Sequence, residues 1–220
     1  KEDRTIDFLK KTVNKIYDAF LTVDKKLYEK HKINRKLPEK ITFISSQELH
    51  DLYPDLSPDQ RETEFVKMHK AIFVYKLGHK LIKNEEFVQN GSASSSDLIS
   101  EQSKEKKQKF KDEFDGRHCI RAPDYDDWTL NGDIIFYHQV LDCAIEMSSM
   151  GIRVDSVSLK LQLKESKTDL TTSEYHDSVL TDRHFTIGGG IGQSRTFMFF
   201  LEETDIRGVQ GETAPFVNNK

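Results

Sequence analysis

The stretch from Thr186 to Leu201 constrains this chain most, because its sequence, TIGGGIGQSRTFMFFL, gathers four of the eleven glycines into five positions. Glycines packed this densely indicate a backbone that another group approaches closely, or one that needs positive φ. The apolar residues on both sides predict a strand, a glycine turn and then a helix. The first turn of that helix would present free N–H groups and a positive dipole end, which suit an anionic ligand.

Two common glycine motifs do not fit this stretch. It lacks Gly-x-x-x-x-Gly-Lys-Ser/Thr, and Gly188 to Gly192 does not follow Gly-x-Gly-x-x-Gly. The pattern does place Arg195 at the start of a buried helix, where a planar guanidinium could stack on an aromatic base. A tight strand-to-helix packing without any ligand explains the glycines about equally well, so this motif alone does not decide the function.

Length and composition fit one domain over residues 1–220, with or without an appended piece. The net charge of −4 gives no general argument for nucleic-acid binding. No stretch approaches the run of about 20 apolar residues that spans a bilayer. Cys119 and Cys143 lie far apart without metal-like spacing, which favours a reducing setting, most simply the cytoplasm.

Hydrophobic periodicity predicts the elements of the first third of the chain. Apolar residues from Ile6 to Leu27 recur at three- and four-residue steps, which is typical of a long amphipathic helix. Ser57 and Pro58 supply an N-cap and a first helical residue. The predicted elements are a helix over 5–31, a strand over 41–45, helices over 46–53 and 57–70, and a strand over 71–75 that is buried on both faces.

The remainder of the chain alternates polar and apolar segments. Residues 89–111 lack an apolar face and are predicted to be a polar insertion or mobile loop. The later elements are predicted as a turn over 130–133, strands over 134–137 and 140–149, and short helices over 156–163 and 173–180. The fold class is therefore α+β, with a mostly antiparallel sheet and helices on one side.

Two acidic residues, Asp133 and Glu146, lie within apolar, strand-like surroundings. An ionised carboxylate there costs several kcal/mol unless it is paired or bound to a cation. Two on neighbouring strands could share one Mg²⁺, which prefers carboxylate and phosphate oxygens. Alternatively, they point to solvent or pair with Arg121 or Arg153. With Arg195 and the glycines in the same chain, the metal–phosphate interpretation is preferred.

Three aspartates crowd the segment Asp124–Trp128. If the segment is extended, two of them share a side that could receive an ammonium group or a cation. An Asp-rich turn after Pro123 is the simpler alternative. Arg153 could bind a carboxylate or phosphate in a bidentate fork, or neutralise a buried acid. Trp128 is expected in the core.

The histidines and cysteines give no catalytic arrangement of the Ser-His-Asp or Cys-His type. No nucleophile or metal-ligand spacing surrounds the histidines of the second half, so they are predicted to be structural or at the surface. These are His118, His138, His176 and His184.

Four motifs together resemble one family. They are RAPDYDDW over 121–128, LNGD over 130–133, EMSSMGIRVD over 146–155 and TIGGGIGQSR over 186–195. In this order they closely resemble ammonia-dependent asparagine synthetase, or aspartate–ammonia ligase. SQEL and YPDL over 46–56 add weaker support.

The resemblance implies a fold like the catalytic core of class II aminoacyl-tRNA synthetases: an antiparallel sheet flanked by helices, in a homodimer. It also implies ATP-dependent activation of the side-chain carboxylate of L-aspartate to a β-aspartyl-adenylate, with release of pyrophosphate. Ammonia then gives L-asparagine and AMP. Neither nucleic acid nor membrane is implied as a partner.

The resemblance carries roles onto nine residues. It places Asp126 and Arg153 at the aspartate and the attacking ammonia. Arg195 would stack on adenine. Asp133 and Glu146 would hold ATP and Mg²⁺. The other residues implied at the nucleotide are Ser149, Gly189, Gly190 and Gly192.

The sequence departs from the family pattern in three ways. The family's N-terminal third is absent, so we expect this chain to derive from a longer protein and to be inactive alone. Only Thr129 separates the Asp-Asp-Trp and Leu-Asn-Gly-Asp motifs, where the family has a longer connection. The insertion over 89–111 is particular to this chain. Two alternatives are a non-catalytic paralogue that binds nucleotide or amino acid and an aspartate-specific aminoacyl-tRNA synthetase core.

Overall fold

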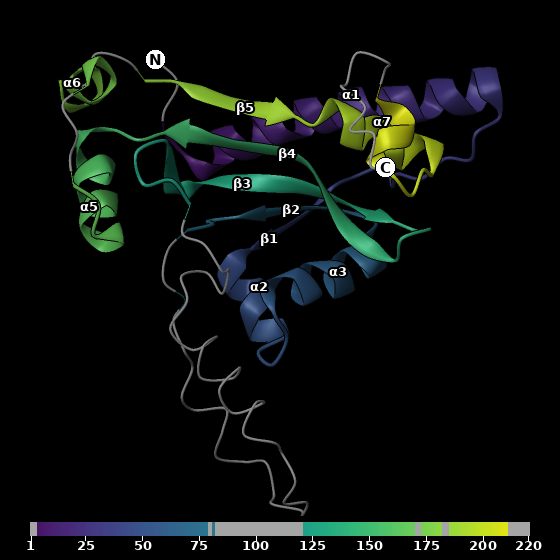
Figure 1. Cartoon of the computed structure of the whole chain (residues 1–220), viewed down its shortest axis with the longest axis horizontal. Helices are drawn as coiled ribbons and strands as arrows, with labels where there is room; N and C mark the ends of the chain where they lie inside the picture. Colours follow the sequence, from purple (N-terminus) through teal and green to yellow (C-terminus); the bar gives the residue numbers. More distant parts are fainter. Residues whose placement is uncertain (1–3, 79–80, 82–120, 170–172, 182–184, 211–220) are drawn as a thin grey trace, which may run out of the picture.

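A five-stranded sheet with the strand order β1-β2-β3-β4-β5 organises the computed structural model (Figure 1). The structure describes residues 4–78, 81, 121–169, 173–181 and 185–210. β1 pairs with β2 in parallel, and the three other pairs are antiparallel. The strands are β1 (Thr42–Ser45), β2 (Ala71–Tyr75), β3 (Asp126–His138), β4 (Cys143–Arg153) and β5 (Ile187–Ile191).

Helices cover both faces of this sheet (Figure 1). The prediction of helices on one side is therefore wrong. β2 is apolar on both faces and needs a cover on each of them to keep it from water. One face packs against α1 (Ile6–His31) and α7 (Gln193–Leu201), and the other packs against α2 (Ser46–Leu52) and α3 (Pro58–His69).

The predicted helix starts are confirmed by their caps. The Thr5 hydroxyl accepts a hydrogen bond from the backbone N–H of Phe8 at the start of α1. Ser45 and Ser57 form reciprocal capping boxes with Glu48 and Gln60, which fix the starts of α2 and α3. These local signals lie within four residues of each other, which is why the sequence alone reveals them.

Residues 130–133, which were predicted to form a turn, lie inside β3, so that prediction is wrong. The Asn131 side-chain amide accepts from the N–H of Leu77 at 2.8 Å and donates to the carbonyl of the same residue at 2.9 Å. Gly132 lets the backbone and Phe73 of β2 approach closely, where a Cβ would collide with them. The Asn-Gly pair therefore serves strand pairing, although it is common in turns.

The glycine run also differs from its prediction, since Gly188 to Gly190 form the strand β5 itself and no turn precedes α7. β5 pairs along its length with β4 from Ser148 to Ile152. Backbone pairing with β4 thus stabilises a strand whose three central residues are glycines. Gly192 is the N-cap of α7.

Two further helices, α5 (Ser156–Ser166) and α6 (Glu174–Leu180), follow β4 and lie at one end of the sheet (Figure 1). Both were predicted within a few residues, and Trp128, expected in the core, is 3% exposed. A 3₁₀-helix, η2 (Ile206–Val209), follows α7. The predicted insertion over 89–111 lies outside the described residues. Of the helices that the structure describes, none is long and apolar enough to cross a membrane.

Candidate active site

A cavity of about 480 Å³ opens beside β4 and β5. Directly paired residues of antiparallel strands point to the same face. Ser149 of β4 pairs with Asp133 of β3, which pairs with Val74 in the core under α2 and α3. The cavity is thus on that face, and its size suits a small-molecule ligand. Its lining residues are Arg121, Ala122, Tyr125, Asp126, Ser149, Arg153, Gly189 and Gly190.

One end of the cavity holds an ion pair between Asp126 and Arg153, which are register partners on β3 and β4. The Arg153 guanidinium lies 3.9 Å from the ring centre of Tyr125. On the β5 side, a Cβ added at Gly188 would lie 2.6 Å from Arg153 Nη2. The guanidinium therefore contacts a carboxylate and an aromatic face. The absence of a side chain at Gly188 leaves the space that the guanidinium occupies.

The Asp126 carboxylate is mostly buried, with 13% of its side chain exposed. Burial raises its pKa above the ordinary value, although the charge and hydrogen bond of Arg153 oppose that shift. A buried, ionised carboxylate is stabilised by a further cation or hydrogen-bond donor. An amine or ammonium ligand in the cavity would satisfy it.

Arg121 also lines the cavity. Its Nη1 donates to the Ser149 hydroxyl at 3.1 Å, and its Nη2 pairs with the Asp133 carboxylate, which is 1% exposed. The sequence offered Arg121 as one pairing partner for a buried acid, and the structure forms that pair. Its place in the cavity, next to Ala122 and Tyr125, was missed. The available signal was that Arg121 begins the RAPDYDDW motif.

Further along β4, Glu146 pairs with Arg195 from the first turn of α7. Arg195 Nη1 lies 3.4 Å from Glu146 Oε1 and donates to the Glu146 carbonyl at 3.1 Å. Both side chains are close to half exposed. The Gly192 N–H donates to the Met147 carbonyl at 2.9 Å and so ties the start of α7 to β4.

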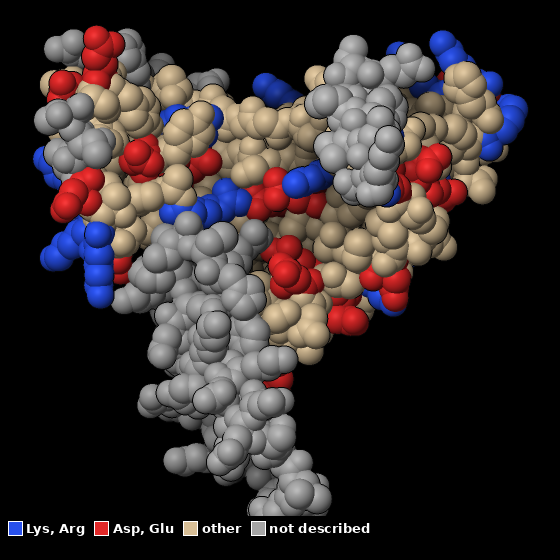
Figure 2. All heavy atoms as spheres, in the orientation of Figure 1, with Lys and Arg blue, Asp and Glu red and all other residues tan. Residues whose placement is uncertain are grey.

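These charged groups follow the sheet in a line. Glu146, Ser149 and Arg153 occur in this order along β4, and each has a partner from a neighbouring element. Figure 2 shows red and blue side chains alternating across the middle of the molecule, over β3 and β4. The line gives an elongated ligand several charged contacts in fixed order.

The two glycines that line the cavity differ in whether the surrounding protein leaves room for a side chain. A Cβ at Gly189 would lie 2.5 Å from Met150 Cβ, so packing requires glycine there. A Cβ at Gly190 would meet none of the described atoms within 4 Å. Gly190 therefore presents a bare backbone to open space in the cavity, and a ligand can lie against it.

The predicted site residues fall into three groups. Five of the nine line the cavity: Asp126, Ser149, Arg153, Gly189 and Gly190. Asp133 joins them through Arg121, while Glu146, Arg195 and Gly192 lie further along β4. His138 and His176 are buried, consistent with a structural role. His118 and His184 lie outside the described residues.

Within the described part of the chain, no three His, Cys, Asp or Glu side chains gather where they could hold a metal. Asp133 and Glu146 supply two carboxylates. By strand pairing, Glu146 lies opposite Ile135, two residues from Asp133 on β3. Two hard oxygen donors fit Mg²⁺ only when ligand phosphates and water complete its shell, which is its usual arrangement beside a nucleotide.

The family model described as aspartate-ammonia ligase matches residues 1–97 and 108–217 of this chain. The chain belongs to the aspartate–ammonia ligase family. It is 42% identical over 218 residues to an aspartate–ammonia ligase of Bacillus cereus (strain G9842) and 44% identical over 221 residues to one of Ureaplasma urealyticum serovar 10. Each match covers 98% of this chain and 57% of the relative, so the chain spans just over half the length of these family members.

Solved structures place the fold among class II aminoacyl-tRNA synthetase cores. An aspartyl-tRNA synthetase from Entamoeba histolytica matches with a TM-score of 0.55 and 13% identity, over 91% of this chain and 39% of that one. The asparaginyl-tRNA synthetase of the same organism matches with a TM-score of 0.51 and 12% identity, over 92% and 44%. At these identities the likeness concerns the fold, and it agrees with the predicted fold class.

Proposed function

We propose that this chain carries the catalytic face of an enzyme that makes L-asparagine from L-aspartate, ammonia and ATP. The observation that supports this most is the ordered line of charged groups along β4, in a member of the aspartate–ammonia ligase family. An acidic amino acid and a nucleotide both carry anionic groups that need arginines at separate places. The line offers arginines at both ends and in the middle.

The nucleotide would occupy the part of the line near α7. Arg195 would stack on adenine, since its side chain is close to half exposed and its guanidinium is anchored at one edge by Glu146. The backbone of Gly189 and Gly190 would lie against the ribose. Gly192 keeps the start of α7 tight against β4 and leaves space for this approach.

The aspartate would occupy the other end, at Arg153 and Asp126. Arg153 would bind a carboxylate of the substrate, and Asp126 would hold its ammonium group or the incoming ammonia. In the first step the side-chain carboxylate oxygen attacks the α-phosphorus of ATP, and pyrophosphate leaves. In the second step ammonia attacks the acyl carbon, the carbon–oxygen bond to AMP breaks, and the nitrogen loses a proton.

Asp133 and Glu146, with Ser149 nearby, would hold ATP together with Mg²⁺. The ion would offset charge on the triphosphate. Arg121, which now contacts both Asp133 and Ser149, is close enough to contribute a further positive charge to the phosphates. Its planar fork favours a phosphate oxygen pair over a single oxygen. On the same basis we propose a homodimer in the cytoplasm, as the family resemblance implies.

The substitution Gly190→Ala tests this assignment, because the new methyl group has room within the described protein but projects into the ligand space. In the full-length protein that contains this sequence, we expect aspartate-dependent pyrophosphate release to show a KM for ATP raised about tenfold. The unfolding temperature should stay within a degree or so of the parent. The matched control is Gly208→Ala in η2, where the nearest atom is the flexible end of Glu203.

Two outcomes would contradict the proposal. If the parent releases no pyrophosphate when aspartate and ATP are supplied, with or without ammonium, the enzyme assignment is wrong. If calorimetry shows that this inactive parent still binds ATP, a non-catalytic nucleotide-binding paralogue becomes the better explanation. If the parent is active and Gly190→Ala binds ATP as tightly as Gly208→Ala does, the nucleotide lies elsewhere on the sheet.

A further inference from the structure

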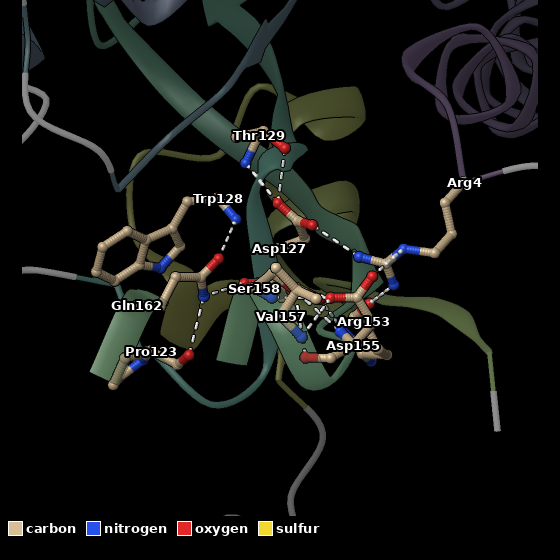
Figure 3. A network of polar contacts seen from close by, with 11 residues as sticks. Arg4, Pro123, Asp127, Trp128, Thr129, Arg153, Asp155, Val157, Ser158 and Gln162 are labelled. Atoms are coloured by element: carbon tan, nitrogen blue, oxygen red, sulfur yellow. Dashed lines mark hydrogen bonds and ion pairs between the residues drawn. The ribbon is translucent and has the colours of Figure 1, made fainter. Parts of the chain in front are cut away.

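Behind the Asp126–Arg153 pair, a network of polar contacts joins α1, β3, β4 and α5 (Figure 3). Its centre is Arg4, which precedes α1 and has 18% of its side chain exposed. Arg4 Nη2 donates to Asp127 Oδ2 at 2.7 Å, and its Nε lies 3.2 Å from Asp155 Oδ2. Its Nη1 donates to the carbonyl oxygen of Arg153.

These three acceptors belong to the segments that carry the catalytic candidates. Asp127 is the chain neighbour of Asp126, and the third acceptor is the main-chain carbonyl of Arg153 itself. Arg4 therefore spans β3 and β4 at the register position where Asp126 and Arg153 are partners. Asp155 adds the N-terminus of α5, which it caps through the N–H groups of Val157 and Ser158.

The same segment is held from its other side by Gln162 of α5, which is 6% exposed. Its side-chain amide donates to the carbonyls of Pro123 and Asp126 at 2.9 and 3.0 Å, and it accepts from the N–H of Trp128 at 2.8 Å. Figure 3 shows Arg4 and Gln162 on opposite sides of Asp127. Gln162 thus holds the backbone at Asp126 to α5, and Arg4 adds side-chain contacts to the strand pairing that joins Asp126 to β4.

We infer that Arg4 is a positioning residue, which sets the distance and orientation of the Asp126–Arg153 pair without touching a ligand in the cavity. This inference rests on the proposed function for its kinetic readout. The chemistry requires arginine, because one planar guanidinium aims separate N–H groups at two carboxylates and a carbonyl. A lysine keeps the charge but presents a single nitrogen, which cannot hold three acceptors at these places.

The test compares Arg4→Lys and Arg4→Ala with the parent, in the full-length protein that contains this sequence. We expect kcat/KM for aspartate in pyrophosphate release to fall at least tenfold in both variants, since misplacing reacting groups by about an ångström costs up to a hundredfold. The KM for ATP should stay within twofold, because the nucleotide contacts lie further along β4. Methylguanidinium, but not methylammonium, should partly restore Arg4→Ala.

The matched control is Arg35→Ala. Arg35 also pairs with a buried aspartate, Asp24, but it follows the far end of α1 and is not part of the cavity or the network. Its loss should lower the unfolding temperature and leave both kinetic constants unchanged. If the Arg4 variants behave in the same way as this control, Arg4 has a structural role only and the inference is wrong.

A readout that needs no activity separates this inference from the proposed function. The N–H of Val154 donates to the Tyr125 carbonyl at 3.0 Å, between the two segments that Arg4 joins. Its hydrogen exchange should accelerate at least tenfold in Arg4→Lys, while that of Phe73 in β2 stays unchanged. Unchanged exchange at Val154 would overturn the inference whether or not the parent is active. An inactive parent with accelerated exchange would instead overturn the proposed function.

Discussion

The two halves of the sheet, a covered side formed by β1 and β2 and an open side formed by β4 and β5, are built from different kinds of residues. On the covered side, β1 and β2 pack between helices, and Ile72 and Phe73 have no exposed surface. On the open side, β4 and β5 carry the charged line, and β5 contributes three consecutive glycines, Gly188 to Gly190. The covered side buries apolar area, while the open side leaves backbone and charge accessible to a ligand.

This difference separates the source of stability from the proposed site of catalysis. Burying apolar side chains stabilises the fold by about 25 cal/mol per Å². A buried ion pair such as Arg121–Asp133 contributes little net stability, because desolvation cancels much of its attraction. The open side therefore depends on the covered side for its stability, and substitutions on the two sides should fail in different ways.

The largest stability effect is expected on the covered side, from Phe73→Ala. The ring is fully buried and lies edge-on to Phe43, with 5.8 Å between the ring centres. Its removal should lower the free energy of unfolding by about 3–5 kcal/mol, because the close-packed sheet cannot collapse into the cavity. Urea unfolding followed by Trp128 fluorescence measures this loss. Phe197→Ala, at a side chain that is 57% exposed, is the control and should cost less than about 0.5 kcal/mol.

The sequence predicted the covered side well, because its signals are local. The periodicity of α1, the capping boxes of α2 and α3, and the apolar run of β2 each lie within one element. The range 71–75 predicted for the strand matches β2. Helices on the second face were missed, since the sequence of α2 and α3 does not reveal which face of a sheet they cover.

The open side was predicted as a set of residues and not as an arrangement. The motifs identified Asp126, Arg153 and Asp133, but the Asp126–Arg153 pair joins residues 27 positions apart. Long-range partners of this kind depend on strand register, which a single sequence does not fix. Arg4 lies 149 residues from Arg153, and no local pattern around it indicates a contact with that residue.

The next effect concerns activity and should leave stability nearly intact. Asp126→Asn should reduce aspartate-dependent pyrophosphate release about a hundredfold, or about 2.7 kcal/mol in the barrier. The free energy of unfolding at pH 7 should change by less than about 1 kcal/mol, because the buried carboxylate is itself unfavourable when ionised. Equal losses of activity in Asp126→Asn and in the surface variant Asp59→Asn would contradict the separation of the two sides.

The pH dependence of Asp126→Asn follows from the raised pKa of Asp126. A carboxyl whose pKa is higher in the folded than in the unfolded state costs stability at pH values above the folded pKa. That cost vanishes below the unfolded pKa of about 3.9. The parent should therefore gain stability relative to Asp126→Asn as the pH falls from neutral to about 4. A stability difference that stays constant over this range would exclude the burial effect.

The smallest effect is expected at Asp155, which contrasts with Asp126 in the sign of its pKa shift. Burial opposes its ionisation, but hydrogen bonds from Ser158 and Val157 and the charge of Arg4 lower its pKa. Asp155→Ala should cost about 1 kcal/mol at pH 7 because α5 loses its cap, whereas Asp155→Asn keeps a capping oxygen and should cost a few tenths. Since the folded pKa is depressed, the contribution of the charge is present above the unfolded pKa and is lost as the pH falls through the folded value. The difference in the free energy of unfolding between the parent and Asp155→Asn should close below about pH 4. Lowering the pH therefore destabilises the parent at Asp155, whereas it stabilises the parent at Asp126. Both aspartates could instead change the free energy of unfolding in the same direction as the pH falls. In that case the proposed contrast between the ligand-facing Asp126 and the structural Asp155 is wrong.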